Sequence, residues 1–194
     1  VKINREAQSE FLTEILHQKS SEITPKFIDY KNMIEETQIG DKKISFVRNK
    51  YNHIAQLHLI YKIGTDHDKE LFLAVQVLQY LGTSRFSADQ LSQEFFKLGI
   101  SNDFKTYDDQ MIISLTGFEE NLIKGFELLK HWITEVKPDD EVYESTIELI
   151  LESRNVAKKD KSRIMTALSH YAKFGENSRF RDVIPEEKLR VTLI

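Results

Sequence analysis

Hydrophobic and polar residues are arranged along this chain at two spacings, one typical of strands and one typical of helices. Residues 54–63 alternate between the two types, which predicts a strand with one buried face. The apolar residues that share this face are Ala55, Leu57, Leu59, Tyr61 and Ile63. Gln56, His58 and Lys62 face the other way. Elsewhere, apolar residues recur every three or four positions, as they do on one side of a helix.

Further strands are expected at 43–48, 100–107 and 110–117, and the first of these is expected to form a hairpin with 54–63. Helices are expected at 5–19, 68–81, 87–99, 119–136, 139–156 and 160–175, with a last helical turn at Pro185. Ser87 and Gln90 have the spacing of a capping box, and Gly99 is a natural helix end. No structure is predicted for 26–37.

This order of elements contains hairpins rather than regular strand–helix–strand crossovers. It predicts an α+β fold, a mostly antiparallel sheet with helices packed mainly on one face. The helix at 68–81 is apolar on nearly every side, so it is expected to lie between the sheet and another layer. Residues 1–25 are interpreted as a linker helix with an extended lead-in, and residues 26–194 as a single αβ domain. The apolar face of the linker helix consists of Phe11, Leu12, Ile15 and Leu16.

Composition narrows the function classes. The net charge of -4 and the pI near 5.9 argue against a nucleic-acid partner. Without cysteine, neither a disulfide framework nor a thiolate metal cluster is possible. No apolar run approaches the length of a membrane span, so no membrane insertion is expected. Bacterial cytoplasm and periplasm both remain open as locations. The start at Val1 and the strand-like end at 191–194 predict a piece of a longer polypeptide.

The helix at 68–81 ends in Tyr80-Leu81-Gly82-Thr83. In this ending it resembles pitrilysin- and insulinase-type zinc metallopeptidases, whose inverted motif H-x-x-E-H lies on a helix that closes in the same way. Counting back, the histidine positions fall on Leu73 and Val77, and the glutamate position falls on Gln76. Aliphatic side chains offer no lone pair to a metal, and an amide cannot take a proton from a bound water.

The resemblance extends over about residues 43–154, because further family-like segments follow in the expected order. These segments are Phe86-Ser-Ala-Asp-Gln-Leu, Phe96-Lys-Leu-Gly, Thr106-Tyr-Asp-Asp-Gln and Phe126-Glu-Leu-Leu. Active members take a third zinc ligand from a glutamate on a later helix, which corresponds here to Glu152, with Glu144 or Glu148 as a companion acid. Glu152 is interpreted as vestigial, an ordinary surface residue. The resemblance therefore implies no metal or cofactor in this chain and zinc in the catalytic half of its parent.

Other residue patterns give weaker indications of a functional site. The six histidines, His17, His53, His58, His67, His131 and His170, include no pair spaced i, i+4 on one helix. Asp108-Asp109 lies between two strands, where a hairpin turn is the simpler interpretation. Ser84 and Ser87 are expected to cap a helix. The aromatic residues expected in the core are Phe95, Phe96 and Phe104.

In the family that this chain resembles, two halves of two αβ domains each close around a peptide, and only the first domain carries zinc. The resemblance implies that this chain is the ligand-less domain opening a second half, forming part of the peptide chamber without cleaving by itself. Its partners would be the catalytic half or a homologous subunit, and a peptide substrate. Two alternatives stay open: a non-catalytic partner subunit, as in mitochondrial processing peptidase, or a structural subunit resembling respiratory-complex core proteins.

Overall fold

The computed structural model describes residues 9–19, 23–25, 27, 29–181 and 183–190. The chain divides between Arg48 and Asn49 into two compact units. The smaller unit contains residues 1–48 and the larger unit contains residues 49–194. The expected strand at 191–194 and the first residues of the expected helix at 5–19 lie outside the described residues. The predicted division into 1–25 and 26–194 stays a prediction.

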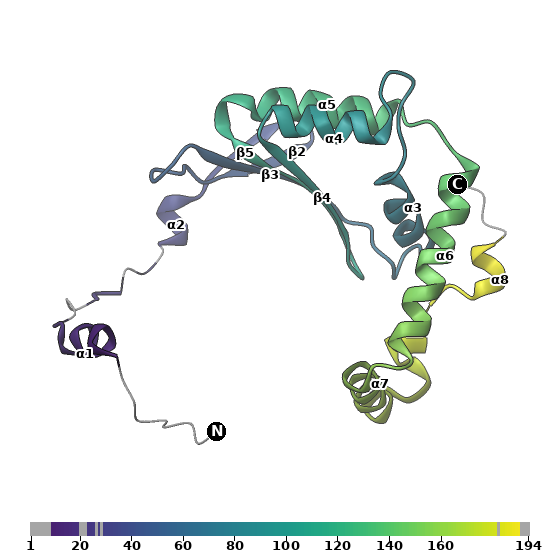
Figure 1. Ribbon diagram of the computed structural model, residues 1–194. Coiled ribbons are helices and arrows are strands. Elements are labelled where there is room, and N and C mark those ends of the chain that lie inside the picture. Colours follow the sequence, from purple (N-terminus) through teal and green to yellow (C-terminus); the bar gives the residue numbers. More distant parts are fainter. Residues whose placement is uncertain (1–8, 20–22, 26, 28, 182, 191–194) are drawn as a thin grey trace. The chain divides into compact units, whose positions relative to one another are not determined.

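The described residues of the smaller unit form two helices and a hairpin (Figure 1). Helix α1 spans Glu10–His17, and the Ser9 hydroxyl caps it by accepting a hydrogen bond from the Leu12 amide at 3.2 Å. The other elements are α2 (Tyr30–Met33), β1 (Glu35–Ile39) and β2 (Lys42–Phe46). The apolar side chains of α1 that the sequence places on one face are 41–72% exposed.

The predicted pairing of the strand at 43–48 with the strand at 54–63 is wrong. β2 pairs with β1 instead, through a two-residue loop in which Gly40 has φ 61°. Gly40-Asp41 forms the hairpin turn, and the partner strand β1 begins within 26–37, for which the sequence predicts no structure. β3 (Ile54–Tyr61) pairs with β5 (Met111–Phe118). Alternation identifies a strand, and it does not identify the strand's neighbour.

The sheet of the larger unit has the strand order β3-β5-β4 and is antiparallel throughout. β4 spans Ile100–Thr106, so the Asp108-Asp109 turn joins it to β5 as expected. Leu57 lies opposite Leu115, and Leu59 lies opposite Ile113, which places these side chains on one face. Tyr61 and Ile63 do not share this burial, since they are 43% and 41% exposed.

The helices of the larger unit follow the predicted order. They are α3 (Glu70–Leu78), α4 (Ala88–Lys97), α5 (Leu122–Thr134), α6 (Asp140–Ala157), α7 (Lys161–Phe174) and α8 (Glu186–Leu189). Short 3-10 turns occupy Glu119–Asn121, Gly175–Asn177 and Arg179–Arg181. Figure 1 shows α4 and α5 together on one face of the sheet. The predicted α+β fold, with an antiparallel sheet covered mainly on one face, is confirmed.

Two hydrophobic clusters hold the larger unit together. The sheet cluster lies between the strands and helices α4 and α5, with Leu91, Phe95, Leu115, Leu129 and Trp132 at its centre. The second, which we call the α3–α6 cluster, joins α3 to α6 and α8. Its buried residues are Leu73, Val77, Leu81, Ile147, Ile184 and Leu189.

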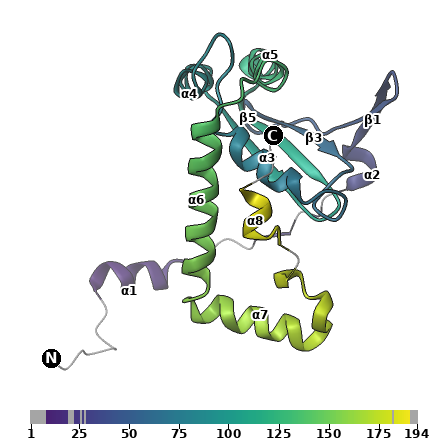
Figure 2. The same cartoon turned by 90° about the vertical axis from the view of Figure 1, so that its right-hand side faces the viewer.

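Helix α3 contributes to both clusters, because Val75 belongs to the sheet cluster while Leu73 and Val77 belong to the α3–α6 cluster. Leu73 and Val77, one turn apart, are therefore buried on one side of the helix and Val75 on the other, as its all-round apolar sequence predicts. Figure 2 shows α3, α6 and α8 next to one another. Helix α3 therefore connects the sheet cluster to the α3–α6 cluster.

The start of α4 offers a direct test of the local sequence signal. The Ser87 hydroxyl accepts from the Gln90 amide at 3.2 Å, and the Gln90 side chain accepts from the Ser87 amide at 2.9 Å. We expect Ser87→Ala to lower the free energy of unfolding by about 1 kcal/mol, because the first turn loses this capping bond. Urea denaturation followed by circular dichroism measures the change. Ser92→Ala, at an exposed position within the same helix, is the matched control and should not destabilise. Equal losses in both variants would contradict the capping role.

Candidate functional site

Leu73 and Val77, the positions that the sequence resemblance compares with zinc ligands, are buried among aliphatic side chains. Leu73 is 0% exposed and Val77 is 2% exposed. Both belong to the α3–α6 cluster, where Ile147 of α6 and Leu189 of α8 are also buried. A divalent cation in this place would lose its hydration and gain no donor atom in return, which is strongly unfavourable. The space between α3 and α6 is therefore a packed core.

Helix α8 is fixed onto α6 by side chains that bind its main chain. The Tyr143 hydroxyl donates to the Leu189 carbonyl at 2.7 Å, and the Arg154 guanidinium donates to the Ile184 carbonyl at 2.8 Å. Burial of the phenol, with a contribution from the Glu70 carboxylate, raises the pKa of Tyr143. The raised pKa extends to higher pH the range in which the phenol can donate this hydrogen bond. These bonds hold Leu189 and Ile184 in the α3–α6 cluster.

The polar residues singled out by the motif do not converge. Gln76 is half-buried on α3, and Glu152 is exposed on α6, where Ile150 and Leu151 turn inward instead. Glu144 is also exposed, and Glu148 accepts from the Arg190 guanidinium at 3.0 Å. Across the part of the chain that the structure describes, no three His, Asp or Glu side chains are grouped so that they could hold a metal ion.

Gly82 and Thr83, at the end of the motif, shape the turn from α3 into α4. Thr83 is buried, its hydroxyl accepts from the Arg85 and Phe86 amides at 3.2 and 3.1 Å, and its amide donates to the Phe86 carbonyl at 2.7 Å. A Cβ on Gly82 would lie 2.6 Å from that same carbonyl oxygen. The chain can therefore turn from α3 into α4 this tightly only because residue 82 is a glycine.

The junction is also attached to α5. Trp132 donates its indole N–H to the Leu81 carbonyl at 3.0 Å, and Thr83 pairs with Val136 in an isolated β-bridge. The Thr83 hydroxyl lies 3.0 Å from Nε2 of His131. Because both lone pairs of this hydroxyl accept from amides, it donates to Nε2, which assigns the proton of the neutral imidazole to Nδ1. Sequence reasoning did not single out Trp132, and it treated His131 only as an isolated histidine.

The remaining histidines are dispersed. His53 and His58 lie on or next to β3 and contact Glu119 and Ser114 at 3.0 and 2.8 Å. Nδ1 of His67 accepts from the Gly64 amide at 3.3 Å, and His170 contacts Ser178 at 3.2 Å. Each of these hydrogen-bond contacts joins one imidazole to one polar group, so no two histidines share a site.

The other candidates resolve into structural roles, with one correction. Asp108 forms an ion pair with Arg179 rather than a carboxylate pair with Asp109. Phe95 and Phe104 are in the core, as expected. The expectation that Phe96 is also in the core is wrong, since this side chain is 85% exposed. Phe96 directly follows a core position on α4, and one residue is 100° of helix rotation, which carries it to the surface.

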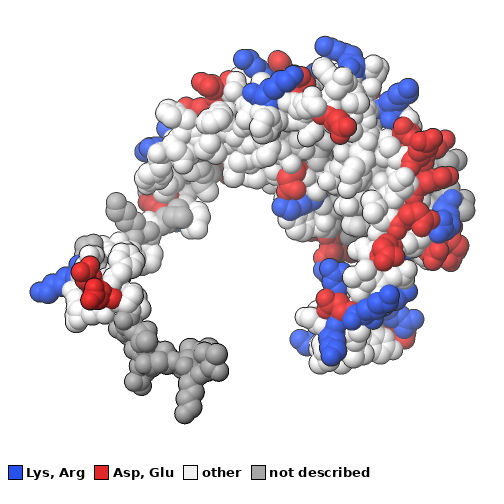
Figure 3. All heavy atoms as spheres, viewed as in Figure 1, with Lys and Arg blue, Asp and Glu red and all other residues white. Residues whose placement is uncertain are grey.

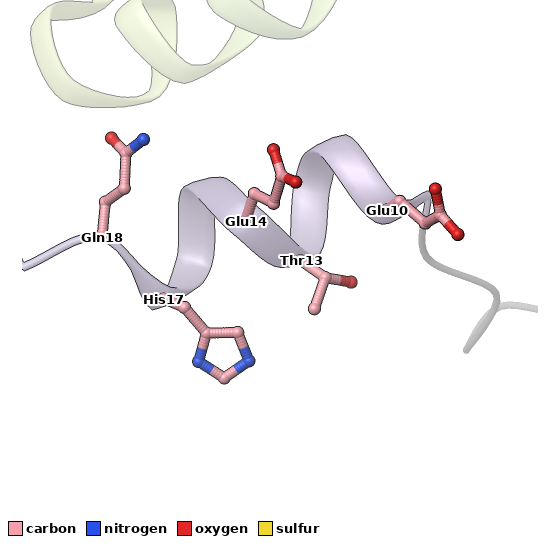
Figure 4. Close-up of a pocket in the computed structure, with 5 residues that line it drawn as sticks. All are labelled: Glu10, Thr13, Glu14, His17 and Gln18. Carbon is pink, nitrogen blue, oxygen red and sulfur yellow. The ribbon is translucent and has the colours of Figure 1, made fainter.

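A hollow beside α1 is lined by side chains of that helix region alone. They are Glu10, Thr13, Glu14, His17 and Gln18. Figure 4 shows that these side chains point in different directions from the helix, with Glu14 and Gln18 on one side and Thr13 and His17 on the other. Without convergence of donors and acceptors, this surface supports no binding site.

The fold has counterparts among solved structures of proteases and of an M16 peptidase inactive domain. The M16 peptidase inactive domain from Pseudomonas fluorescens matches with a TM-score of 0.65 and 14% identity, over 81% of this chain and 42% of that chain. The ferredoxin protease FusC, solved with Arabidopsis ferredoxin, matches with a TM-score of 0.67 and 15% identity, over 92% and 22%. The periplasmic protease PqqL from Escherichia coli matches with a TM-score of 0.61 and 12% identity, over 96% and 24%.

These similarities establish the fold, an α+β domain of the type found in M16 peptidases and in their inactive domains. No protein-family model matches the sequence, and no curated protein matches it either. The chain spans less than half the length of the solved chains that it matches. Within the described residues, no helix has both the length and the apolar character that crossing a bilayer requires.

Placing metal-ligand side chains at these positions tests whether the space between α3 and α6 is a packed core. We expect the triple variant Leu73→His, Gln76→Glu, Val77→His to lose more than about 3 kcal/mol of stability, because it removes buried aliphatic groups and adds unpaired polar ones. We also expect it to bind no stoichiometric zinc. Thermal unfolding with and without zinc measures both effects. The control pair Phe72→His and Gln79→Glu changes exposed positions of α3 and should cost less than about 1 kcal/mol. A stable triple variant with one tightly bound zinc would contradict the packed core.

The contact between His53 and Glu119 predicts a pH effect. A hydrogen bond and the charge of Glu119, with a smaller contribution from Glu120, raise the pKa of His53. The pair therefore stabilises the fold fully below the unfolded-state pKa of histidine, and this stabilisation is lost as pH rises through the raised folded-state pKa. In an NMR titration, Glu119→Gln should lower the pKa of His53, whereas the distant Glu144→Gln should leave it unchanged. An unaltered His53 titration in the first variant would refute this assignment.

Proposed function

We propose that this chain is a ligand-less domain of a pitrilysin/insulinase-type zinc metallopeptidase. In this proposal it forms part of the wall of a peptide-binding chamber and takes no part in bond cleavage. The observation that carries the proposal is the burial of Leu73 and Val77 against Ile147 and Leu189, where the active domains would hold zinc. Zinc would belong to a catalytic half elsewhere in the parent polypeptide or in a homologous subunit.

The sheet supplies a physical means of holding a peptide. β3 and β4 are the outer strands of the β3-β5-β4 sheet, so each has one side without a partner strand within that sheet. An extended peptide adds to such an edge through main-chain hydrogen bonds, which depend little on its sequence. β4 also packs beside α3, the helix that carries the degenerate motif. The β4 edge is therefore the place where a peptide in the chamber would approach this domain.

A second candidate function is that of a non-catalytic partner or structural subunit. The Pseudomonas fluorescens structure supports it, because that chain is described as an inactive domain and is more than twice as long as the part matched here. The two candidates differ in where the zinc motif lies. An intact H-x-x-E-H encoded in the same polypeptide favours the single-chain peptidase, and its absence favours the partner or structural subunit.

The first experiment concerns the purified chain. After incubation with one equivalent of zinc and dialysis, elemental analysis should find no stoichiometric metal, because the motif positions offer no ligands. Fluorogenic peptides should not be hydrolysed, with or without a chelator. An unfolded peptide added at high concentration should shift NMR amide signals of the edge strands β3 and β4 before those of α5. Chelator-sensitive hydrolysis by the purified chain would refute the proposal.

A further inference from the structure

Helix α7 is the one long helix of the larger unit in which no described side chain is buried. It is joined to the segment that follows it through His170, which contacts Ser178 at 3.2 Å and the Phe180 ring with centroids 5.7 Å apart, and through the Tyr171 hydroxyl, which donates to Glu176 at 3.1 Å. A stripe of apolar residues at helical spacing runs along this helix. Their exposed fractions are 39% for Ile164, 63% for Met165, 58% for Leu168 and 44% for Tyr171. A contiguous apolar stripe of this kind on a soluble domain indicates an interaction surface.

The surroundings of this α7 stripe are basic. The positively charged residues of α7 and of the corner before it are Lys158, Lys159, Lys161, Arg163 and Lys173. Asp160, the N-cap, is the only acid among residues 158–174, and Glu176, which accepts from the Tyr171 hydroxyl, forms an ion pair with Arg181. Figure 3 shows blue side chains gathered at this end of the larger unit. Two α7 stripes facing each other would therefore place like charges together, which opposes a simple α7–α7 contact.

A surface of opposite charge lies on α6. A shallow groove between the end of α3 and the outer side of α6 is lined by Tyr80, Glu141, Val142, Ser145, Thr146 and Leu149. Tyr80 is 54% exposed and Leu149 is 61% exposed, so the groove offers apolar surface to a partner. Glu141 lines the groove, and Glu152 lies three helical turns after it on the same side of α6. Figure 3 shows the red side chains along α6.

We propose that two copies of this chain associate by placing the α7 stripe of each in the α6 groove of the other. The two surfaces are complementary in charge and both are apolar, and they lie on consecutive helices of one unit. A twofold axis would make both contacts at once and bury both pairs of surfaces in a closed dimer. The inference does not depend on the peptidase-related function.

Charge complementarity and apolar burial should respond to different changes: the first to salt concentration, the second to substitutions in the α7 stripe. Each contribution to association can therefore be tested separately. The exposed ion pairs are screened by salt, so association should weaken as ionic strength rises from about 0.05 to about 0.5 M. The apolar stripe sets the contact area, so Leu168→Ser should weaken association without altering its salt dependence. Both effects are measured by sedimentation velocity over about 1–300 μM, the range in which weak interfaces dissociate.

Charge-reversal variants distinguish this specific contact from non-specific association. The basic-side variant Lys161→Glu, Arg163→Glu and the acidic-side variant Glu141→Lys, Glu152→Lys should each weaken association at least about tenfold. The quadruple variant that carries all four changes should recover it, because the charges are again complementary. The control Lys124→Glu, Lys130→Glu makes the same net charge change on α5 and should have no effect. Circular dichroism verifies that every variant is folded.

Several results would overturn the proposal. One is a chain that stays monomeric over the whole concentration range. Another is association that the control variant disrupts as strongly as the basic-side variant. A third is a quadruple variant that is folded and remains monomeric. A monomer that binds vesicles containing about 30% phosphatidylglycerol, and loses this binding in the basic-side variant, would assign the α7 stripe to a lipid surface instead.

Discussion

The burial of α3 on two sides is the constraint on which the larger unit depends. Val75 faces the sheet cluster, while Leu73 and Val77 face α6 and α8, so a helix of nine residues joins two cores. A helix buried on two sides has few solvent-exposed positions at which polar side chains can be placed. Leu73 and Val77, which the sequence resemblance compares with metal-binding histidines, are needed here for packing. Burial in this cluster and metal binding would make opposite demands on these two residues.

Elements whose signal is local were predictable from the sequence. The capping box of α4, the glycine at its end and the apolar periodicity of α5 and α6 all specify structure through neighbouring residues. Strand pairing was not predictable in the same way. β2 and β3 are adjacent in sequence, yet each hydrogen-bonds to a different strand, because pairing is decided by the packing of a whole face. The short α2 and β1 carry too few periodic positions to be recognised.

The candidate site shows the same division. The spacing of Leu73, Gln76 and Val77 along the helix was readable, and so was their unsuitability as ligands. The packing around these positions was not predictable, since Leu189, which is buried in the same cluster, comes from a four-residue helix more than a hundred positions later in the chain. The attachment of Leu81 to Trp132, and of Thr83 to His131, likewise depends on tertiary contacts. Gly82 and Thr83 are best understood as backbone requirements of the turn between α3 and α4, independent of catalysis.

Trp132 gives the molecule an internal optical reporter. It is the sole tryptophan of the chain, it is 5% exposed, and its ring lies against Phe95 and Phe104 with centroids 6.1 and 5.4 Å away. Its indole N–H donates to the carbonyl of Leu81, shortly after the end of α3. Emission from the unlabelled polypeptide therefore originates where the strands, α5 and the end of α3 come together. A change in its wavelength signals a loosening of that meeting point, without contributions from α1 or α7, which carry no indole.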